Sequence, residues 1–223
     1  MATRPVRPYR PRALILDMDG LMIDSEPLWY RVEAEFARAR GGAWTPELAA
    51  SCIGRGMRAT LDTMHRICGF AVEHDRDAAE IVDRFMARVG ELTLKRGCLD
   101  LLHAARGRVP VALASSSPRR LIEAVVKALE LGPNLDVVLS GEVVAHPKPA
   151  PDLFLRAAAD LGAPPEACVV LEDSLAGVQA GRAAGMIVIA MPEGPAVPAL
   201  SSAADTVVAD LTEARFLLVL DGS

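Results

Sequence analysis

The chain of 223 residues is short of aromatic side chains, which make up 4% of it, although 51% of its residues are hydrophobic. A buried core must therefore consist mainly of alanine, valine, leucine and isoleucine, which suits helices packed against a β-sheet. Lysine is also scarce, because only Lys95, Lys127 and Lys148 accompany the arginines. The length suits one large domain, or a core that carries a smaller insert.

The chain also lacks the charge and the motifs of several other classes of protein. Its net charge of −5 gives no indication of a basic face, so we expect no nucleic acid partner. The four cysteines form no C-x-x-C pair and no cluster with zinc spacing, which favours reduced thiols in a cytoplasmic protein.

Nothing in the N-terminal sequence predicts insertion into a membrane. The apolar run 13–16 is far too short to span a bilayer or to form the core of a signal peptide. The basic, proline-punctuated residues 1–12 are interpreted as a disordered or extended lead-in. We expect no membrane partner, and a monomer is the default expectation.

Continuous apolar runs predict the strands of a parallel sheet whose two faces are both covered. These runs span residues 13–17, 109–115, 167–171 and 186–190, with weaker candidates at 136–140 and 206–209. Helical spacing of apolar or small residues predicts helices over 118–130, 151–161 and 174–184. Strands that alternate with helices indicate a doubly wound α/β domain, in which ligands bind at the carboxyl ends of the strands.

The segment between the first strand and the next convincing one predicts helices only. These helices are expected over 28–40, 46–50, 57–68 and 76–93. Because the segment leaves and rejoins the core beyond the first strand, it should lie over the carboxyl edge of the sheet as a cap. We therefore predict an α/β core of residues 13–27 and 96–223 and an inserted helical cap domain of residues 28–95.

Two aspartates, Asp17 and Asp19, come directly after the first predicted strand. Side chains alternate along a strand, so both carboxylates could emerge on one side, and Gly20 lets the chain turn close to a ligand. One carboxylate could attack phosphorus and bind a metal while the other acts as acid and base. A surface turn that ends the strand is the alternative explanation.

Hydroxyl groups and a lysine follow two later elements. Ser115 and Ser116 end the strand 109–115 and could bind an anion with hydroxyl and backbone N–H groups, whereas Ser117 is a plausible cap of the next helix. Lys148 lies between two prolines, which restrain its backbone and favour a fixed cation beside a phosphoryl group. A solvated loop lysine remains the alternative.

A pair of acids, Glu172 and Asp173, follows the strand 167–171 and precedes a predicted helix. Paired carboxylates at a strand end suit Mg²⁺, although capping of the helix would explain them as well. Each of these motifs is weak alone. Together they occur in order at the carboxyl ends of three strands and in one loop, which favours a single phosphoryl-transfer site.

These motifs resemble those of the haloacid dehalogenase-like superfamily, in its phosphatase branch. The family's four motifs match DMDGL at 17–21, Ser115, Lys148 within KPAPDLF, and LEDSLAGVQAGRAAGM at 171–186. The stretch DMDGLMIDSEPLW is similar to the sugar-phosphatase and β-phosphoglucomutase-like subgroup in particular. The resemblance covers the whole chain after about residue 12.

The resemblance implies a Mg²⁺-dependent phosphatase that acts through an aspartyl phosphate on a small phosphorylated metabolite. Asp17 would be the nucleophile, and Asp19 would protonate the leaving alkoxide and then activate water. Ser115, Ser116 and Lys148 would hold the transferring phosphoryl group. The ligands of Mg²⁺ would come from Asp17, the backbone carbonyl of Asp19, Asp173 and, as a further ligand, Glu172.

A β-phosphoglucomutase-type phosphomutase is the nearest alternative function. Those mutases resemble one another in having a histidine where this chain has Trp29, so we prefer hydrolysis, first of all of a sugar phosphate. A signalling receiver lacks such a helical insert, and the intact acids disfavour a non-catalytic phosphate-binding protein. Candidate specificity residues are Trp29, Arg55, Met57 and Arg58, although ordinary packing or solvation explains each of them equally well.

Overall fold

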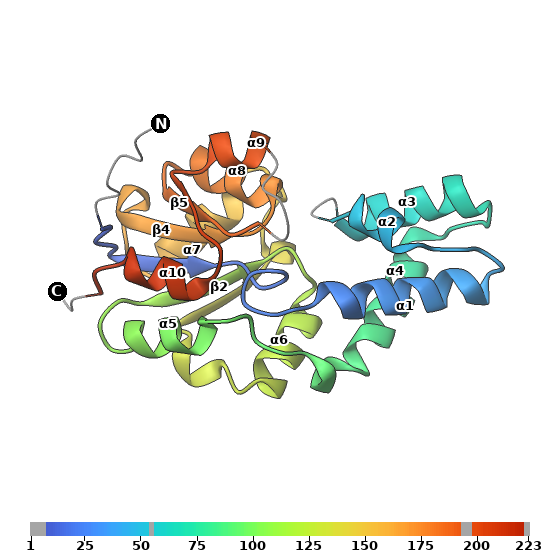
Figure 1. The fold of residues 1–223 in the computed structure, drawn as a ribbon, viewed down its shortest axis with the longest axis horizontal. Helices are drawn as coiled ribbons and strands as arrows, with labels where there is room; N and C mark the ends of the chain where they lie inside the picture. The colour runs from blue at the N-terminus through green and yellow to red at the C-terminus, as the bar shows by residue number, and fades with distance from the viewer. Residues whose placement is uncertain (1–7, 54–55, 193–197, 221–223) are drawn as a thin grey trace.

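A six-stranded parallel sheet forms the centre of the computed structural model, which describes residues 8–53, 56–192 and 198–220 (Figure 1). Its strands stand in the order β3-β2-β1-β4-β5-β6. They are β1 Ala13–Leu16, β2 Val111–Ser115, β3 Val137–Ser140, β4 Cys168–Glu172, β5 Ile187–Ala190 and β6 Thr206–Val207. Chain order changes direction between β1 and β4, so the predicted doubly wound α/β fold is confirmed.

Alternate residues of β1 face two separate cores, one on each side of the sheet. Leu14 and Leu16 pack into the first core, whereas Ala13 and Ile15 pack into the second. The first core includes residues of α5 (Cys98–Ala105), α6 (Arg119–Ala128) and α10 (Leu211–Phe216). The second includes residues of α7 (Asp152–Asp160), α8 (Leu175–Ala183) and α9 (Pro198–Ala203). Because both faces are buried, the central strands are continuous apolar runs, as the sequence predicts.

Four helices between β1 and α5 lie together to one side of the sheet, and we call them the helical insert (Figure 1). They are α1 (Glu26–Ala39), α2 (Pro46–Ala50), α3 (Gly56–Cys68) and α4 (His74–Met86). Phe36, Leu61 and Phe85, from three of these helices, are wholly buried. These side chains belong to the same apolar cluster as the first core, so the packing of the insert is continuous with that of the sheet.

Two chain segments join the helical insert to the sheet, and they run side by side. Ile23 and Leu94 form an antiparallel bridge, and the N–H of Asp24 donates to the carbonyl oxygen of Thr93 at 2.9 Å. Helix α4 also contacts α6 of the core. These two paired segments hold the start of α1 beside the carboxyl edge of the sheet.

One predicted helix is shorter in the structure, and the N-terminal lead-in is described only in part. The helix expected over 76–93 ends at Met86, and a short 3-10 turn over Val89–Glu91 follows, because the backbone leaves the helical conformation at Arg88, which has a φ of −126° and a ψ of 14°. Residues 1–7 of the expected lead-in lie outside the described residues. Within the described part of that lead-in, Tyr9 forms a parallel bridge with Leu218, and its N–H donates to the carbonyl oxygen of Leu217 at 2.7 Å, which is the extended alternative of the prediction.

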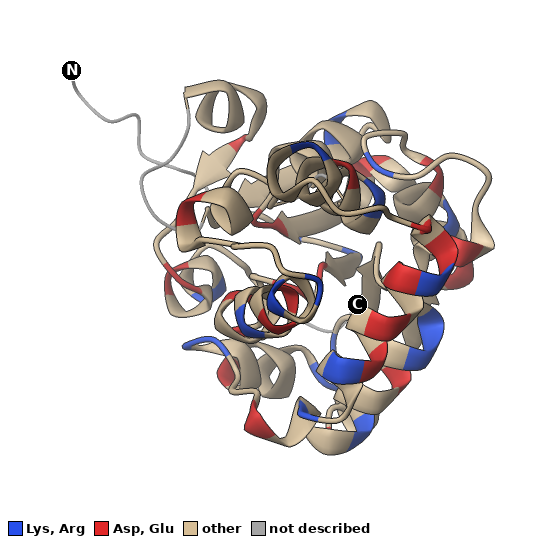
Figure 2. Ribbon diagram, turned by 90° about the vertical axis from the view of Figure 1, so that its right-hand side faces the viewer, with Lys and Arg blue, Asp and Glu red and all other residues tan. Residues whose placement is uncertain are grey.

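The helices carry both signs of charge at their surfaces. Figure 2 shows Lys and Arg interspersed with Asp and Glu along them. Arg40 and Glu80, for example, pair at 2.8 Å across the helical insert. Within the described part of the chain, no helix combines the length and the apolar character that a membrane span needs.

Candidate active site

The carboxyl ends of three neighbouring strands bring the predicted acidic and hydroxyl residues to one edge of the sheet. Asp17 follows β1, Ser115 ends β2, and Glu172 ends β4 with Asp173 directly after it. They line one cavity of about 460 Å³, to which Lys148 also contributes. The cavity lies at the ends of β1 and β4, the two strands between which the strand order changes direction. Ligands bind at this position in doubly wound sheets.

Lys148 is a buried cation whose three N–H bonds all have acceptors. Its Nζ donates to Asp17 Oδ1 at 2.5 Å, to Glu172 Oε1 at 2.7 Å and to the carbonyl oxygen of Ala114 at 3.2 Å. The same nitrogen lies 4.6 Å from the centre of the Phe154 ring. Burial lowers the pKa of Lys148, but the charges of Asp17 and Glu172 outweigh burial and raise it above its ordinary value. The ammonium is therefore charged and fixed in place.

Three carboxylates crowd around this cation. Asp17, Glu172 and Asp173 each offer an oxygen within 4.8 Å of the others. Burial raises the pKa of Asp17 to about 7, with Lys148 opposing the shift and Glu172 adding to it. Burial and the same neighbouring acids raise the pKa of Asp173 well above its usual range. Three carboxylates beside a single ammonium leave an excess of negative charge, and their oxygens are the ligands that a divalent cation such as Mg²⁺ prefers.

Glu172 is oriented by more contacts than the lysine alone. Its Oε2 accepts hydrogen bonds from the N–H of Ser174 at 2.8 Å and from the hydroxyl of Ser174 at 2.9 Å. A Cβ at Gly177, on the first turns of α8, would lie 1.8 Å from Glu172 Oε1. The glycine thus makes room for the carboxylate, and Glu172 in turn positions Lys148.

A second close approach involves the turn after β1. Gly20 has a φ of +73°, and a Cβ there would lie 2.2 Å from Asp173 Oδ2. Glycine adopts such a left-handed conformation without strain, and its missing side chain leaves space for the carboxylate. This turn lets Asp19 and Asp173 face one cavity from different strands.

Asp19 receives hydrogen bonds from both the helical insert and the core. Trp29 Nε1 donates to Asp19 Oδ1 at 3.1 Å, and Ser117 Oγ donates to Asp19 Oδ2 at 2.7 Å. Trp29 lies on α1, and its ring stacks on Phe85 of α4 at a centroid distance of 4.1 Å. The carboxylate of Asp19 is therefore held between two parts of the chain that are far apart in sequence.

The prediction that Ser117 caps the following helix is wrong. Helix α6 begins at Arg119, and its N-cap position is Pro118, which has no side-chain hydrogen bond. Ser117 instead points to Asp19, as described above, and its N–H donates to Ser115 Oγ at 3.1 Å. Ser115 is buried, while Ser116 is exposed and lines the cavity.

Comparisons with known proteins agree with this arrangement. The sequence model of haloacid dehalogenase-like hydrolases matches residues 11–185. The chain belongs to the haloacid dehalogenase-like hydrolase family. Hexitol phosphatase B of Escherichia coli K12 is 34% identical over 218 residues, which cover 92% of this chain and 95% of that protein. Fructose-1-phosphate phosphatase YqaB of Escherichia coli K12 is 33% identical over 192 residues, which cover 79% and 94%.

Solved structures of the haloacid dehalogenase-like family have the same fold. CbbY from Rhodobacter sphaeroides, in complex with phosphate, has a TM-score of 0.78 at 26% identity and covers 91% of this chain and 96% of that one. A family hydrolase from Deinococcus radiodurans R1, with bound phosphate and sodium, has a TM-score of 0.75 at 28% identity over 95% and 98%. The predicted family and the enzyme class, a phosphoric monoester hydrolase, are thus confirmed.

The candidate specificity residues of this family member lie in different places. Trp29 and Met57 line the cavity from the helical insert. Arg58 is exposed on α3 and is not among the described residues that line the cavity, and Arg55 lies outside the described residues. The sequence prediction overlooked Glu33, which lines the same cavity from α1 and is buried.

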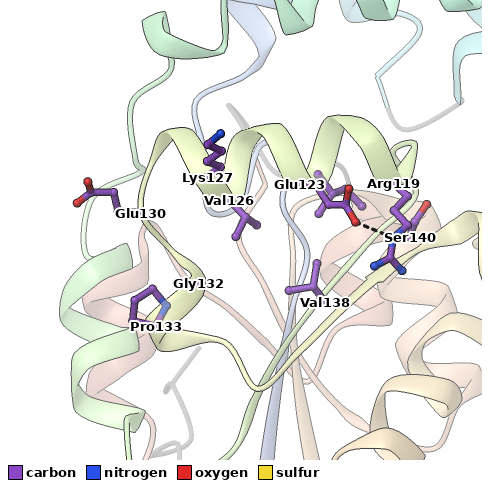
Figure 3. A pocket seen from close by; sticks show the side chains of 10 residues that line it. Arg119, Glu123, Val126, Lys127, Glu130, Gly132, Pro133, Val138 and Ser140 are labelled. Carbon is purple, nitrogen blue, oxygen red and sulfur yellow. Dashed lines mark hydrogen bonds and ion pairs between the residues drawn. The ribbon is translucent and has the colours of Figure 1, made fainter.

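A second cavity, of about 350 Å³, lies between α6 and β3 (Figure 3). Val126 and Val138 contribute apolar walls, and Arg119 pairs with Glu123 at 2.7 Å at its rim. The buried Ser140 is already engaged, since its Oγ donates to the carbonyl oxygen of Ser117 at 2.7 Å. The acids described above do not line this cavity, so the candidate active site is the acidic one.

Proposed function

We propose that the chain is a Mg²⁺-dependent phosphatase that hydrolyses a small phosphorylated sugar through an aspartyl phosphate on Asp17. The observation that carries the proposal is the meeting of the Lys148 ammonium with the carboxylates of Asp17, Glu172 and Asp173 in one cavity. The names of the hexitol and fructose-1-phosphate phosphatases support the class of substrate.

The proposed reaction divides between the two aspartates. An oxygen of Asp17 attacks phosphorus while the bond from phosphorus to the sugar oxygen breaks and Asp19 gives that oxygen a proton. Asp19 then takes a proton from water, whose oxygen attacks the phosphorus and releases inorganic phosphate and the Asp17 carboxylate. Lys148 stabilises the negative charge of the transferring phosphoryl group together with Ser115 and its neighbouring N–H groups.

Magnesium would be held by Asp17, Asp173 and the backbone carbonyl of Asp19, with Glu172 as a further ligand. When bound, it supplies positive charge beside the phosphoryl oxygens. The contacts of Glu172 with Lys148 and Ser174 suit an additional role, in which Glu172 orients the lysine.

We also propose that residues 28–95 act as a cap domain over this site. Trp29, Met57 and Val82 of the helical insert line the same cavity as Asp17 and Lys148. A cap in this position excludes bulk water and holds the acid and base group, Asp19, against Trp29. We infer that the enzyme acts as a cytoplasmic monomer, which cell fractionation and gel filtration would test.

Hydrolysis is favoured over mutase chemistry by the charge of the cavity. Among the described residues that line it, Lys148 is the one cation, whereas six are acids. A mutase that works through a bisphosphate must hold a second phosphate, and an acidic wall repels such a group.

The test is phosphate release from a panel of sugar and polyol phosphates with Mg²⁺, with Asp17→Asn as the inactive control. A parallel reaction supplies β-glucose 1-phosphate with a trace of bisphosphate. Free phosphate as the main product supports the proposal, whereas accumulation of glucose 6-phosphate identifies a mutase. Hydrolysis by Asp17→Asn at the wild-type rate would remove this residue from the nucleophile role.

A further inference from the structure

Glu33 is a buried acid beside the active-site cavity that the proposed reaction does not use. It lies on α1, four residues after Trp29, so both side chains share one face of the helix. Glu33 is 7% exposed and lines the same cavity as Asp17 and Lys148. A buried carboxylate is costly unless hydrogen bonds satisfy it, so its presence in this wall calls for a partner.

The structure gives Glu33 a single partner among the described residues. Trp44 Nε1 donates to Glu33 Oε2 at 2.8 Å. Among the described residues, the fully buried side-chain polar atoms that lack a hydrogen-bond partner are Ser25 Oγ and Asn134 Oδ1. The other oxygen of Glu33, Oε1, is not among them although no hydrogen bond is seen for it, so this oxygen is not fully buried. Burial raises the pKa of Glu33 to about 7, and the bond from Trp44 opposes that shift only in part. One indole N–H leaves most of the acceptor capacity of this group unused.

The position of Glu33 along α1 indicates which part of a substrate it would meet. The indole of Trp29 contacts Asp19, and α1 then runs away from the sheet (Figure 1). Glu33 lies about one helical turn, or about 5 Å, further along the helix. A group bound there belongs to the carbon chain of the substrate rather than to its phosphoryl end.

The residues around Glu33 limit which chemical groups of a substrate it can bind. Among the described residues of the segment 28–95 that line the cavity, none carries a formal positive charge, and they include Tyr30, Cys52, Met57, Thr60 and Val82. A carboxylate in such a wall accepts hydrogen bonds from hydroxyl groups and repels a second anion.

We propose that Glu33 is a specificity-determining residue that accepts hydrogen bonds from hydroxyl groups on the carbon chain of the substrate. The inference rests on the proposed function and deepens it. It selects monophosphorylated sugars and polyols with free hydroxyls several atoms from the phosphate, and it rejects substrates whose far end carries another phosphate or a carboxylate.

The test compares substrates that differ in the part remote from phosphorus. Glu33→Gln keeps the shape and an acceptor for Trp44, and Glu33→Leu removes both. Glu35→Gln is the matched control, because Glu35 lies on the same helix but pairs with Arg88 at 2.9 Å away from the cavity lining. Each variant is assayed for kcat and KM with a hexitol phosphate, p-nitrophenyl phosphate and phosphoglycolate, and its thermal unfolding is measured.

For Glu33→Leu we expect kcat/KM for the hexitol phosphate to fall about 10–100-fold relative to kcat/KM for p-nitrophenyl phosphate, mainly through a higher KM. A lost hydrogen bond to a charged group weakens binding by about this factor. Glu33→Gln should show a smaller loss and a gain for phosphoglycolate relative to the hexitol phosphate. If Glu33→Leu is unfolded, Glu33→Gln alone carries the comparison. The Glu35→Gln control should leave the ratios unchanged.

Equal effects on all three substrates, or none, would overturn the role of Glu33 and leave the proposed function standing. The wild type separates the two proposals. If it releases phosphate from p-nitrophenyl phosphate but from no hydroxylated substrate, the sugar phosphatase assignment fails, and the role of Glu33 fails with it.

Discussion

Replacing Lys148 with methionine removes the buried cation of the site and keeps most of the side chain's volume. The lysine side chain is 5% exposed, and its Nζ lies 2.5 Å from Asp17 Oδ1 and 2.7 Å from Glu172 Oε1. Breaking a buried ion pair from one side costs about 3–5 kcal/mol, because the remaining charges stay buried without a partner. We expect Lys148→Met to lower the free energy of unfolding by about this amount at pH 8.

The loss of unfolding free energy in Lys148→Met, relative to the wild type, should become smaller at acidic pH. Burial raises the pKa of Asp17 to about 7 even with Lys148 opposing the shift, so the pKa should rise further once Lys148 is gone. A carboxyl whose pKa is higher in the folded than in the unfolded chain destabilises the fold above that pKa. Its penalty is relieved progressively between that pKa and the unfolded value of about 3.9. Between pH 8 and pH 5 we expect the deficit to fall by about 1–2 kcal/mol.

The assay is urea unfolding of both proteins at pH 8 and pH 5, after chelation of divalent metal. Lys127→Met is the control, because Lys127 is exposed on α6, and its substitution should change stability by less than about 0.5 kcal/mol. A Lys148→Met protein as stable as this control would refute the account of a cation held between buried acids. A deficit that is the same at both pH values would refute its electrostatic part.

Trp29→Phe should keep the stacked ring but lose the hydrogen bond to Asp19, and we expect kcat to fall about tenfold with substrate binding less affected, as steady-state kinetics would reveal. Gly177→Ala places a methyl group against Glu172 Oε1, so it should lower both the unfolding midpoint and the affinity for Mg²⁺ by calorimetry, whereas Gly90→Ala, with open space around it, should not. Added Mg²⁺ should raise the Tm of the wild type more at pH 8 than at pH 5, because protons compete with the metal for carboxylates of raised pKa; equal shifts would argue against binding at these acids.

The fold could be predicted from the sequence because each buried strand is a continuous apolar run, which is visible locally in the sequence. The apolar run 13–17 predicted β1, which is buried on both faces, and the run 167–171 predicted β4 within one residue at each end. Helix ends were harder to predict. The helix expected over 76–93 stops at Met86, since apolar spacing continues past the point at which the backbone turns.

The candidate site was only partly readable. Its acids follow strands β1 and β4, and Lys148 lies in the loop between β3 and α7, so the order of these motifs along the chain predicted that they would meet. Ser117 and Glu33 were missed for a different reason: helix-cap chemistry and helical periodicity describe neighbours along the chain, and neither says which face meets a cavity. The space that Gly177 leaves for Glu172 likewise depends on how α8 packs against β4.

The most direct test of the account is to look for phosphate on Asp17. Asp19→Asn protein is mixed with Mg²⁺ and a hydrolysable phosphate ester, quenched in acid, digested and analysed by mass spectrometry, with Asp17→Asn as the control. We predict the added mass of one phosphoryl group on the side chain of residue 17, absent from the control. Turnover by the wild type with no phosphoryl group on Asp17 in any quenched sample, or with the group on another residue, would contradict the account.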